Sequence, residues 1–139
     1  MKESVKKEIE EIMEHHDYDC SVEEFISKDH WFLISIYQYL SEDFIREFKD
    51  KLEWKFISKN QKLSENFIRE FKNYINWYQV SRYQKLSENF ILEFKDKVNW
   101  NRIEKYQEIV KKDIKVIEKQ KITELEKNKI ENKFKLIKF

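Results

Sequence analysis

The sequence predicts an all-α fold, an array of short two-helix repeats with a helical cap at each end. Three near-identical segments carry this prediction: they begin at Leu40, Leu63 and Leu86, which gives a period of 23 residues. In each copy the apolar residues recur at the spacing of one helix face, and the chain contains no Gly and no Pro. A period of this length is typical of proteins whose units bury their apolar faces only against neighbouring units. Without Gly or Pro, short joints between helices are favoured over β-hairpins.

Each repeat is predicted to contain a first helix, helix A, and a second helix, helix B. From Phe44 the apolar spacing is i, i+1, i+4, i+8, and Ser41 stands where an N-cap belongs, so the first helix A should cover roughly 42–51. Helix B should begin at the tryptophan of each copy, with Asn76 and Asn99 as caps in two copies. The predicted repeat core consists of aromatic residues in fixed columns: Phe44, Phe48, Trp54, Phe67, Phe71, Trp77, Phe90, Phe94 and Trp100.

The chain is predicted to be one domain, residues 1–139, because its length suits a single domain and a weaker copy of the pattern extends the array toward the N-terminus. Its segments are an N-terminal cap helix at 1–16, a degenerate repeat at 17–39, repeats at 40–62, 63–85 and 86–108, and a helical C-terminal cap at 109–139. Apolar residues after the third copy continue at helical spacing, so its helix B is expected to run on into a longer helix. Array ends need polar caps, and the charged termini suit that role.

Composition excludes several classes of function. With no Gly, phosphate-binding loops and glycine-based nucleophile elbows are excluded. The single cysteine, Cys20, and the lack of a long apolar run predict an intracellular, cytoplasmic protein that neither spans a membrane nor depends on internal disulfides. The net charge is only +1, but residues 1–30 hold 4 Lys against 10 Asp and Glu, whereas residues 101–139 hold 12 Lys and Arg against 7. We therefore expect an electric dipole along the array.

The consensus of the copies, WxxISxYQKLSExFIxEFKDKV, covers residues 31–107 and resembles a short helical repeat of giant DNA viruses, phages and some bacteria. Asn60, Leu92 and Glu104 depart from the pattern. The resemblance implies an α-helical array and a viral or mobile-element source, which would place the protein in a host cytoplasm. It brings no catalytic residues with it.

Candidate chemical sites are few, and no cofactor is expected. The side chains suited to a metal, His15, His16, Asp17, Asp19 and Cys20, lack the paired spacing that zinc requires, so we predict a polar joint and no metal site. His30 is predicted to pack or cap beside Trp31. The recurring serines and carboxylates form no nucleophile–base pair, and we predict that the protein is not an enzyme.

Residues that depart from the consensus in one copy are the candidates for binding, because residues needed for folding should recur in every copy. Phe56, Tyr74, Tyr78 and Leu92 are apolar or aromatic at columns expected on the surface, and we predict that they contact a partner. A similar group near residue 32 is expected to contact the capping helices instead: Phe32, Leu33, Ile36 and Tyr39. The tyrosine column of Tyr37, Tyr83 and Tyr106 cannot be assigned to a face from the sequence.

The resulting hypothesis is a non-catalytic protein-binding module. If the source is a virus or phage, its partner would be a host factor, such as a CRISPR effector or another nuclease-based defence protein that the module inhibits. Two alternatives remain open: a nucleic-acid-binding protein that uses the basic C-terminal segment, and a structural protein that assembles with itself.

Overall fold

A computed structural model describes residues 1–107 and 111–137 of the chain. In this part the chain forms ten α-helices and no strand, which confirms the predicted all-α array of short helices. The helices are α1 (Glu3–His15), α2 (Val22–Ser27), α3 (Trp31–Tyr37), α4 (Glu42–Glu47), α5 (Trp54–Asn60), α6 (Glu65–Glu70), α7 (Trp77–Tyr83), α8 (Glu88–Glu93), α9 (Trp100–Tyr106) and α10 (Lys111–Ile137).

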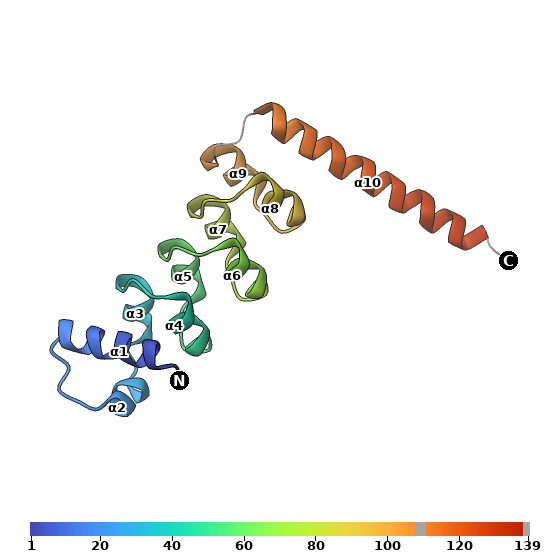
Figure 1. Cartoon of the computed structure of the whole chain (residues 1–139). Coiled ribbons are helices and arrows are strands. Elements are labelled where there is room, and N and C mark those ends of the chain that lie inside the picture. The colour runs from blue at the N-terminus through green and yellow to red at the C-terminus, as the bar shows by residue number, and fades with distance from the viewer. Residues whose placement is uncertain (108–110, 138–139) are drawn as a thin grey trace.

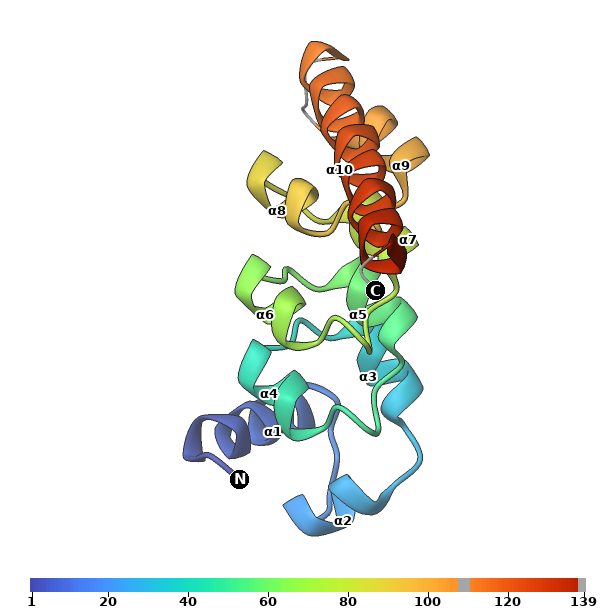
Figure 2. The ribbon, with the colours of Figure 1, turned by 90° about the vertical axis from the view of Figure 1, so that its right-hand side faces the viewer.

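The short helices lie in two rows (Figures 1 and 2). Helices α4, α6 and α8 are the A helices of the three repeats and form the A row. Helices α3, α5, α7 and α9 form the B row, in which each helix contacts the next. One face of every B helix therefore points away from the A row, and these faces line up along the array.

Helix α1 occupies the position in the A row that precedes α4. It contacts α4, and it lies in line with the A row in Figure 2, whereas α2 lies outside that line. The Glu8 carboxylate accepts a hydrogen bond from the backbone N–H of Ser41 at 2.8 Å, as Glu42 does from Ser64 one repeat later. The cap helix, rather than a helix of the degenerate segment 17–39, thus completes the A row.

Capping side chains set the start of α4, α6, α7, α8 and α9, as the sequence predicts, whereas α1, α3 and α5 begin without a side-chain cap. Ser41 Oγ accepts a hydrogen bond from the N–H of Phe44 at 3.1 Å, and the equivalent serines and Asn76 and Asn99 act in the same way. The A helices are shorter than expected, because α4 ends at Glu47 and not near residue 51. Residues 48–52 form a turn instead, closed by a hydrogen bond from Leu52 N–H to Phe48 O at 3.2 Å.

The core runs along the space between the rows. Phe44, Phe67 and Phe90 are completely buried, and so are the isoleucines that follow them. The predicted placement of Trp54, Trp77 and Trp100 in the core is wrong in part, because all three are only half-buried. Their indole N–H groups donate to backbone carbonyls five residues earlier, which holds each indole at the edge of the core. Phe94 is also half-buried, since it belongs to the last repeat.

Buried glutamines join neighbouring repeats. Gln84 Oε1 accepts a hydrogen bond from Leu63 N–H at 3.1 Å, and Gln84 Nε2 donates to the carbonyl oxygens of Ser58 at 2.9 Å and Gln61 at 2.7 Å. Gln107 makes the same three bonds one period later, and Gln61 makes two of them. Because these backbone groups are buried, each needs such a partner. The glutamine column therefore fixes the register between repeats.

Arginine–glutamate pairs join the A helices on the outside. Arg46 pairs with Glu70 at 2.9 Å, and Arg69 pairs with Glu93 at 2.8 Å, in both cases one repeat further along the chain. The hydrogen bond that Arg46 donates to Glu70, together with nearby negative charge, raises the pKa of Arg46 above its ordinary value. These pairs are exposed to solvent, so each contributes little to stability.

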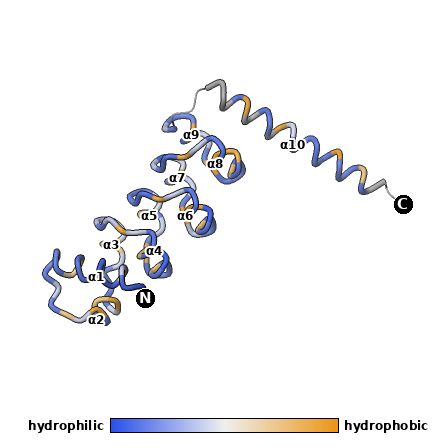
Figure 3. The backbone as a smooth tube through the Cα atoms, viewed as in Figure 1, coloured by the Kyte–Doolittle hydropathy of each residue, from blue (hydrophilic) through white to orange (hydrophobic). Residues whose placement is uncertain are grey.

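Helix α10 is long and has no continuous apolar stripe. Its hydrophobic residues are scattered along it (Figure 3), and those that are described are exposed. The expectation that the tail after residue 122 is helical is confirmed up to Ile137. Helix α9 ends at Tyr106, so the helix B of the last repeat does not run on there, and residues 108–110 lie outside the described part. Among the described helices, none combines the length and hydrophobicity needed to cross a lipid bilayer.

Candidate interaction surface

The four residues predicted to contact a partner lie in three different places. Phe56 in α5 and Tyr78 in α7 belong to the B row, Tyr74 lies in the turn after α6, and Leu92 lies in α8 of the A row. Tyr74 and Tyr78 are exposed, whereas Phe56 and Leu92 are half-buried. They do not form one surface.

Tyr74 has a structural explanation. Its ring centroid lies 5.2 Å from that of Trp54 and 5.8 Å from that of Phe71, and the Lys49 ammonium lies 5.5 Å from the Tyr74 ring centroid. The ring thus adds apolar contact to an indole that is otherwise only half-buried, which explains why an aromatic residue stands at this position.

Leu92 marks the end of the arginine–glutamate series. It occupies the position of Arg46 and Arg69, each of which pairs with a glutamate one repeat further along. The residue at the corresponding position after Leu92 is Val116, not a glutamate. An arginine at position 92 would therefore lack the partner that the others have, and a leucine leaves no charge unpaired.

The outer face of α3 carries an apolar patch, which we call the α3 patch and define as Phe32, Leu33, Tyr37 and Tyr39. Between 52% and 94% of each side chain is exposed, and α3 contains no charged residue. The Phe32 ring contacts Phe56 of α5 edge-on, with centroids 5.4 Å apart. The expectation that the capping helices cover this group is wrong for Phe32 and Tyr39, which are 52% and 94% exposed, and holds only in part for Leu33, which is 53% exposed but shares a cavity with Ile12 of α1. Phe25 of α2 packs against the buried Trp31 instead, with ring centroids 6.5 Å apart.

A cavity of about 190 Å³ adjoins the α3 patch. Its walls are mainly apolar or aromatic, and Leu33 and Tyr37 belong both to the patch and to the cavity. At its rim the side chains of Gln38 and His16 meet, with their Nε2 atoms 2.5 Å apart. An exposed apolar patch next to a cavity is the usual setting for an anchoring side chain of a partner.

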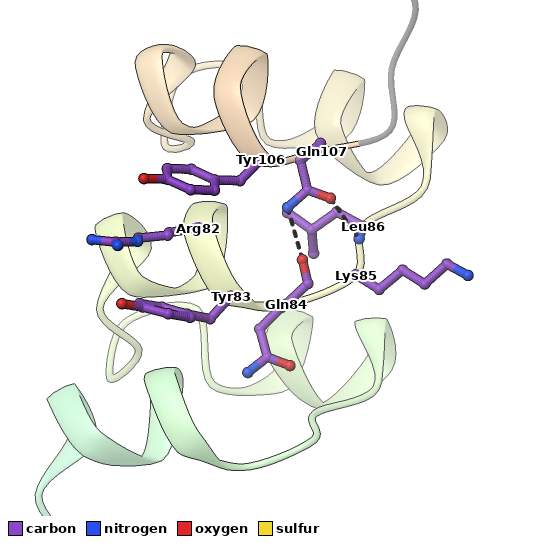
Figure 4. A pocket seen from close by; sticks show the side chains of 7 residues that line it. All are labelled: Arg82, Tyr83, Gln84, Lys85, Leu86, Tyr106 and Gln107. Atoms are coloured by element: carbon purple, nitrogen blue, oxygen red, sulfur yellow. Dashed lines mark hydrogen bonds between the residues drawn. The ribbon is translucent and has the colours of Figure 1, made fainter.

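Further along the B row, cations and tyrosine rings alternate in what we call the cation–tyrosine ladder, defined as Lys59, Arg82, Tyr83, Lys105 and Tyr106. The Arg82 guanidinium lies between two rings, 4.8 Å from the centroid of Tyr83 and 4.9 Å from that of Tyr106 (Figure 4). Lys59 lies 5.5 Å from the Tyr83 centroid, and Lys105 lies 5.3 Å from the Tyr106 centroid. Tyr83, Tyr106 and Arg82 also line a groove of about 340 Å³ between α7 and α9.

The ladder and its surroundings carry an excess of positive charge. Helices α5, α7 and α9 contain one carboxylate, Glu104, against five cations: Lys55, Lys59, Arg82, Arg102 and Lys105. Among the described residues Arg82 and Arg102 form no ion pair, in contrast to both arginines of the A row. Desolvation is the largest influence on Tyr106 and raises its pKa, but the hydrogen bond from Lys105 and the surrounding cations outweigh it and lower the pKa overall. The local field is therefore positive.

The histidine-rich joint after α1 does not assemble a metal site. Within residues 1–107 and the described part of α10, no three His, Cys, Asp or Glu side chains converge as metal ligands. The rings of His15 and His16 meet edge-on, and Cys20 is a half-buried free thiol. The recurring Ser41, Ser64 and Ser87 cap helices, and their hydroxyls take a structural role.

His30 is buried among aromatic rings, as predicted for a packing residue, and its pH dependence can be tested. Burial lowers its pKa below the ordinary value of 6.5, the nearby Lys28 adds to this, and Asp29 opposes it. The unfolded chain therefore binds a proton more readily than the folded chain, so the contribution of His30 to stability is complete above pH 6.5 and falls as the pH is lowered through that value.

We expect the free energy of unfolding of the His30→Phe variant to fall less on acidification than that of the wild type, because the variant lacks this titrating group. Urea unfolding on both sides of pH 6.5 measures the difference. The exposed His15→Phe variant is the control, and equal acid sensitivity of the two variants would contradict the assignment.

No protein-family model, no curated protein and no solved structure matches this chain. The site therefore has to be interpreted from its own chemistry. Sequence reasoning missed Arg82, Arg102 and the lysines of the ladder, although one signal was present: residues 59, 82 and 105 occupy one repeat position and are all cationic.

Proposed function

We propose that this protein is a non-catalytic binding module, and that its partner is a protein that inserts apolar side chains against the α3 patch. The observation that carries the proposal is the exposure of four large apolar or aromatic side chains on and just after a helix without charge. Scattered apolar residues on a surface are ordinary, but a contiguous group beside a cavity is characteristic of an interface.

The composition of the whole B-row face supports a protein partner. Tyrosine, phenylalanine and arginine are the residues enriched in protein–protein interfaces, and this face presents all three. The further hypothesis that the partner is a host defence factor rests on the resemblance to viral and phage repeats alone. Of the alternatives, nucleic-acid binding through the C-terminal segment is less favoured, because the nine lysines of α10 are interspersed with five carboxylates.

A peptide-library selection tests the proposal. Random peptides displayed on phage are selected on the wild-type protein, and the affinities of recovered peptides are measured for Leu33→Asp. We expect a loss of about tenfold or more, because a charge would replace a leucine whose burial by the peptide contributes about 1.5 kcal/mol or more.

Leu125→Asp is the matched control, because Leu125 of α10 is 52% exposed and Leu33 is 53% exposed. The control variant should bind the selected peptides as the wild type does. The α3 patch would be overturned as the docking site if no binding peptide were recovered, or if the recovered peptides bound Leu33→Asp with the same affinity as the wild type.

A further inference from the structure

We propose that the partner presents a single acidic segment with an apolar end, which lies along the B row with its apolar end on the α3 patch and its carboxylates on the cation–tyrosine ladder. This inference rests on the proposed function and adds the chemistry and the placement of the bound segment.

The patch and the ladder belong to one continuous face. Tyr37 of the patch occupies the repeat position that Tyr83 and Tyr106 occupy in the ladder, and Leu33 occupies that of Arg102. Since successive B helices contact each other from α3 to α9, equivalent positions lie in a line along the row. A ligand bound to the patch therefore meets the ladder if it continues in the direction of α9.

The ladder is organised to receive anions. Arg82 has no carboxylate partner among the described residues, and the rings of Tyr83 and Tyr106 hold its guanidinium in place. Its Nε atom is buried and makes no hydrogen bond with the described residues, as is also true of Arg102. Side chains that are already held in position lose little conformational freedom when a ligand binds, so a carboxylate gains more from them than from mobile surface lysines.

The contacts of the tyrosine rings favour carboxylates of a protein over a nucleic acid. Binding of single strands depends on bases that stack on free aromatic faces. Here cations from the same helix and from a neighbouring helix approach each ring of the ladder: Arg82 and Lys59 approach Tyr83, and Lys105, Arg102 and Arg82 approach Tyr106. The groups left for a ligand are N–H and O–H donors, and the α3 patch contains no cation that could pair with a phosphate.

The dimensions suit a short segment. Neighbouring packed helices lie about 8–10 Å apart, so the three steps from α3 to α9 cover roughly 24–30 Å. An extended chain advances about 3.3 Å per residue, and about eight or nine residues would cross that distance. One peptide can therefore contact both the patch and the ladder.

Fluorescence anisotropy with three labelled probes tests the inference. The first probe is a peptide with a block of Leu and Phe joined to a block of Glu, synthesised in both block orders. The second has Gln in place of Glu, and the third is an oligodeoxythymidylate. At low salt we expect the Glu peptide to bind about tenfold more tightly than the Gln peptide, since several charge pairs form and each contributes a few-fold at a partly exposed site.

Paired variants locate the charges. The double variant Arg82→Gln with Lys105→Gln should abolish the advantage of the Glu peptide, and Arg82→Lys should retain most of it. Lys127→Gln with Lys129→Gln removes the same charge from exposed positions of α10 and should change nothing. Circular dichroism and thermal unfolding check that each variant is folded, and the Arg82→Lys comparison separates loss of charge from loss of structure.

The outcomes separate the inference from the proposed function. Equal binding of the Glu and Gln peptides, both sensitive to Leu33→Asp, would overturn the acidic segment and leave the α3 patch as a docking site. Tight binding of the oligonucleotide that disappears in the Arg82 and Lys105 variant would assign the ladder to nucleic acid and overturn the inference. If neither peptide binds or Leu33→Asp has no effect, the proposed function falls as well.

Discussion

Gln84→Ala is expected to lower the free energy of unfolding by about 3 kcal/mol or more, a large effect for a single uncharged polar residue. The substitution removes three hydrogen bonds and leaves buried backbone groups of Ser58, Gln61 and Leu63 without partners. An unsatisfied buried polar group costs about 1–3 kcal/mol, and the cavity left by the side chain adds to the loss. Urea unfolding followed by circular dichroism measures the change.

Gln38→Ala is the matched control for this substitution. Gln38 occupies the same repeat position in the first unit, but it is only half-buried, and the partner of its side chain is His16. We expect a loss below about 1 kcal/mol, as for a typical single hydrogen bond. Similar losses for the two variants would show that the glutamine column does not hold the repeats together.

Phe71→Ala should destabilise the protein by about 3–5 kcal/mol, whereas Phe94→Ala should cost about half as much. The two residues occupy the same position in consecutive repeats, and a tryptophan of the preceding repeat lies against each ring, with centroids 5.2 Å and 5.1 Å apart. Phe71 is 6% exposed, but Phe94 belongs to the last repeat and is only half-buried. Removing a buried phenylalanine costs its transfer free energy and leaves a cavity, and both terms shrink where solvent already reaches the ring.

The comparison also tests where the array ends. It uses the same substitution at the same repeat position, so differences in side-chain chemistry cancel. Thermal or urea unfolding of both variants gives the two losses. Equal losses would mean that the last repeat is covered as fully as the inner repeats, contrary to an array that ends at α9.

Much of the fold could be predicted from the sequence, because repetition reveals which positions matter for packing. Ser41 and Asn76 were predicted as caps, and they are, since side-chain capping depends on residues close in the chain. The end of α4 at Glu47 could not be predicted in this way. The apolar spacing continues to Leu52, and no Gly or Pro marks the turn, so only the packing of the next helix decides where helix A ends.

The candidate surface was harder to predict, for two physical reasons. Residues that recur in every copy were set aside as structural, and Lys59, Arg82 and Lys105 were set aside with them. A surface that uses one cation from each repeat also recurs in every copy, so recurrence does not distinguish such surface residues from core residues. Phe32, Leu33 and Tyr39 of the α3 patch were expected to contact the capping helices because they lie near the start of the array. How much of α3 the cap covers depends on the path of the chain between α1 and α3, and Leu33 keeps more than half of its surface exposed although it lies beside α1.

The glutamine column has a consequence for the gene that encodes this protein. Every junction between the complete repeats uses the same hydrogen-bond donors and acceptors. If residues 63–85 were deleted, Gln107 would still meet the carbonyl of a glutamine one unit earlier. If they were duplicated, the second Gln84 would do the same. Loss or gain of one such unit would change the number of repeats without leaving these backbone groups unpaired. A protein with more or fewer units would keep the apolar patch at the start of the array and would have a longer or shorter row of cations.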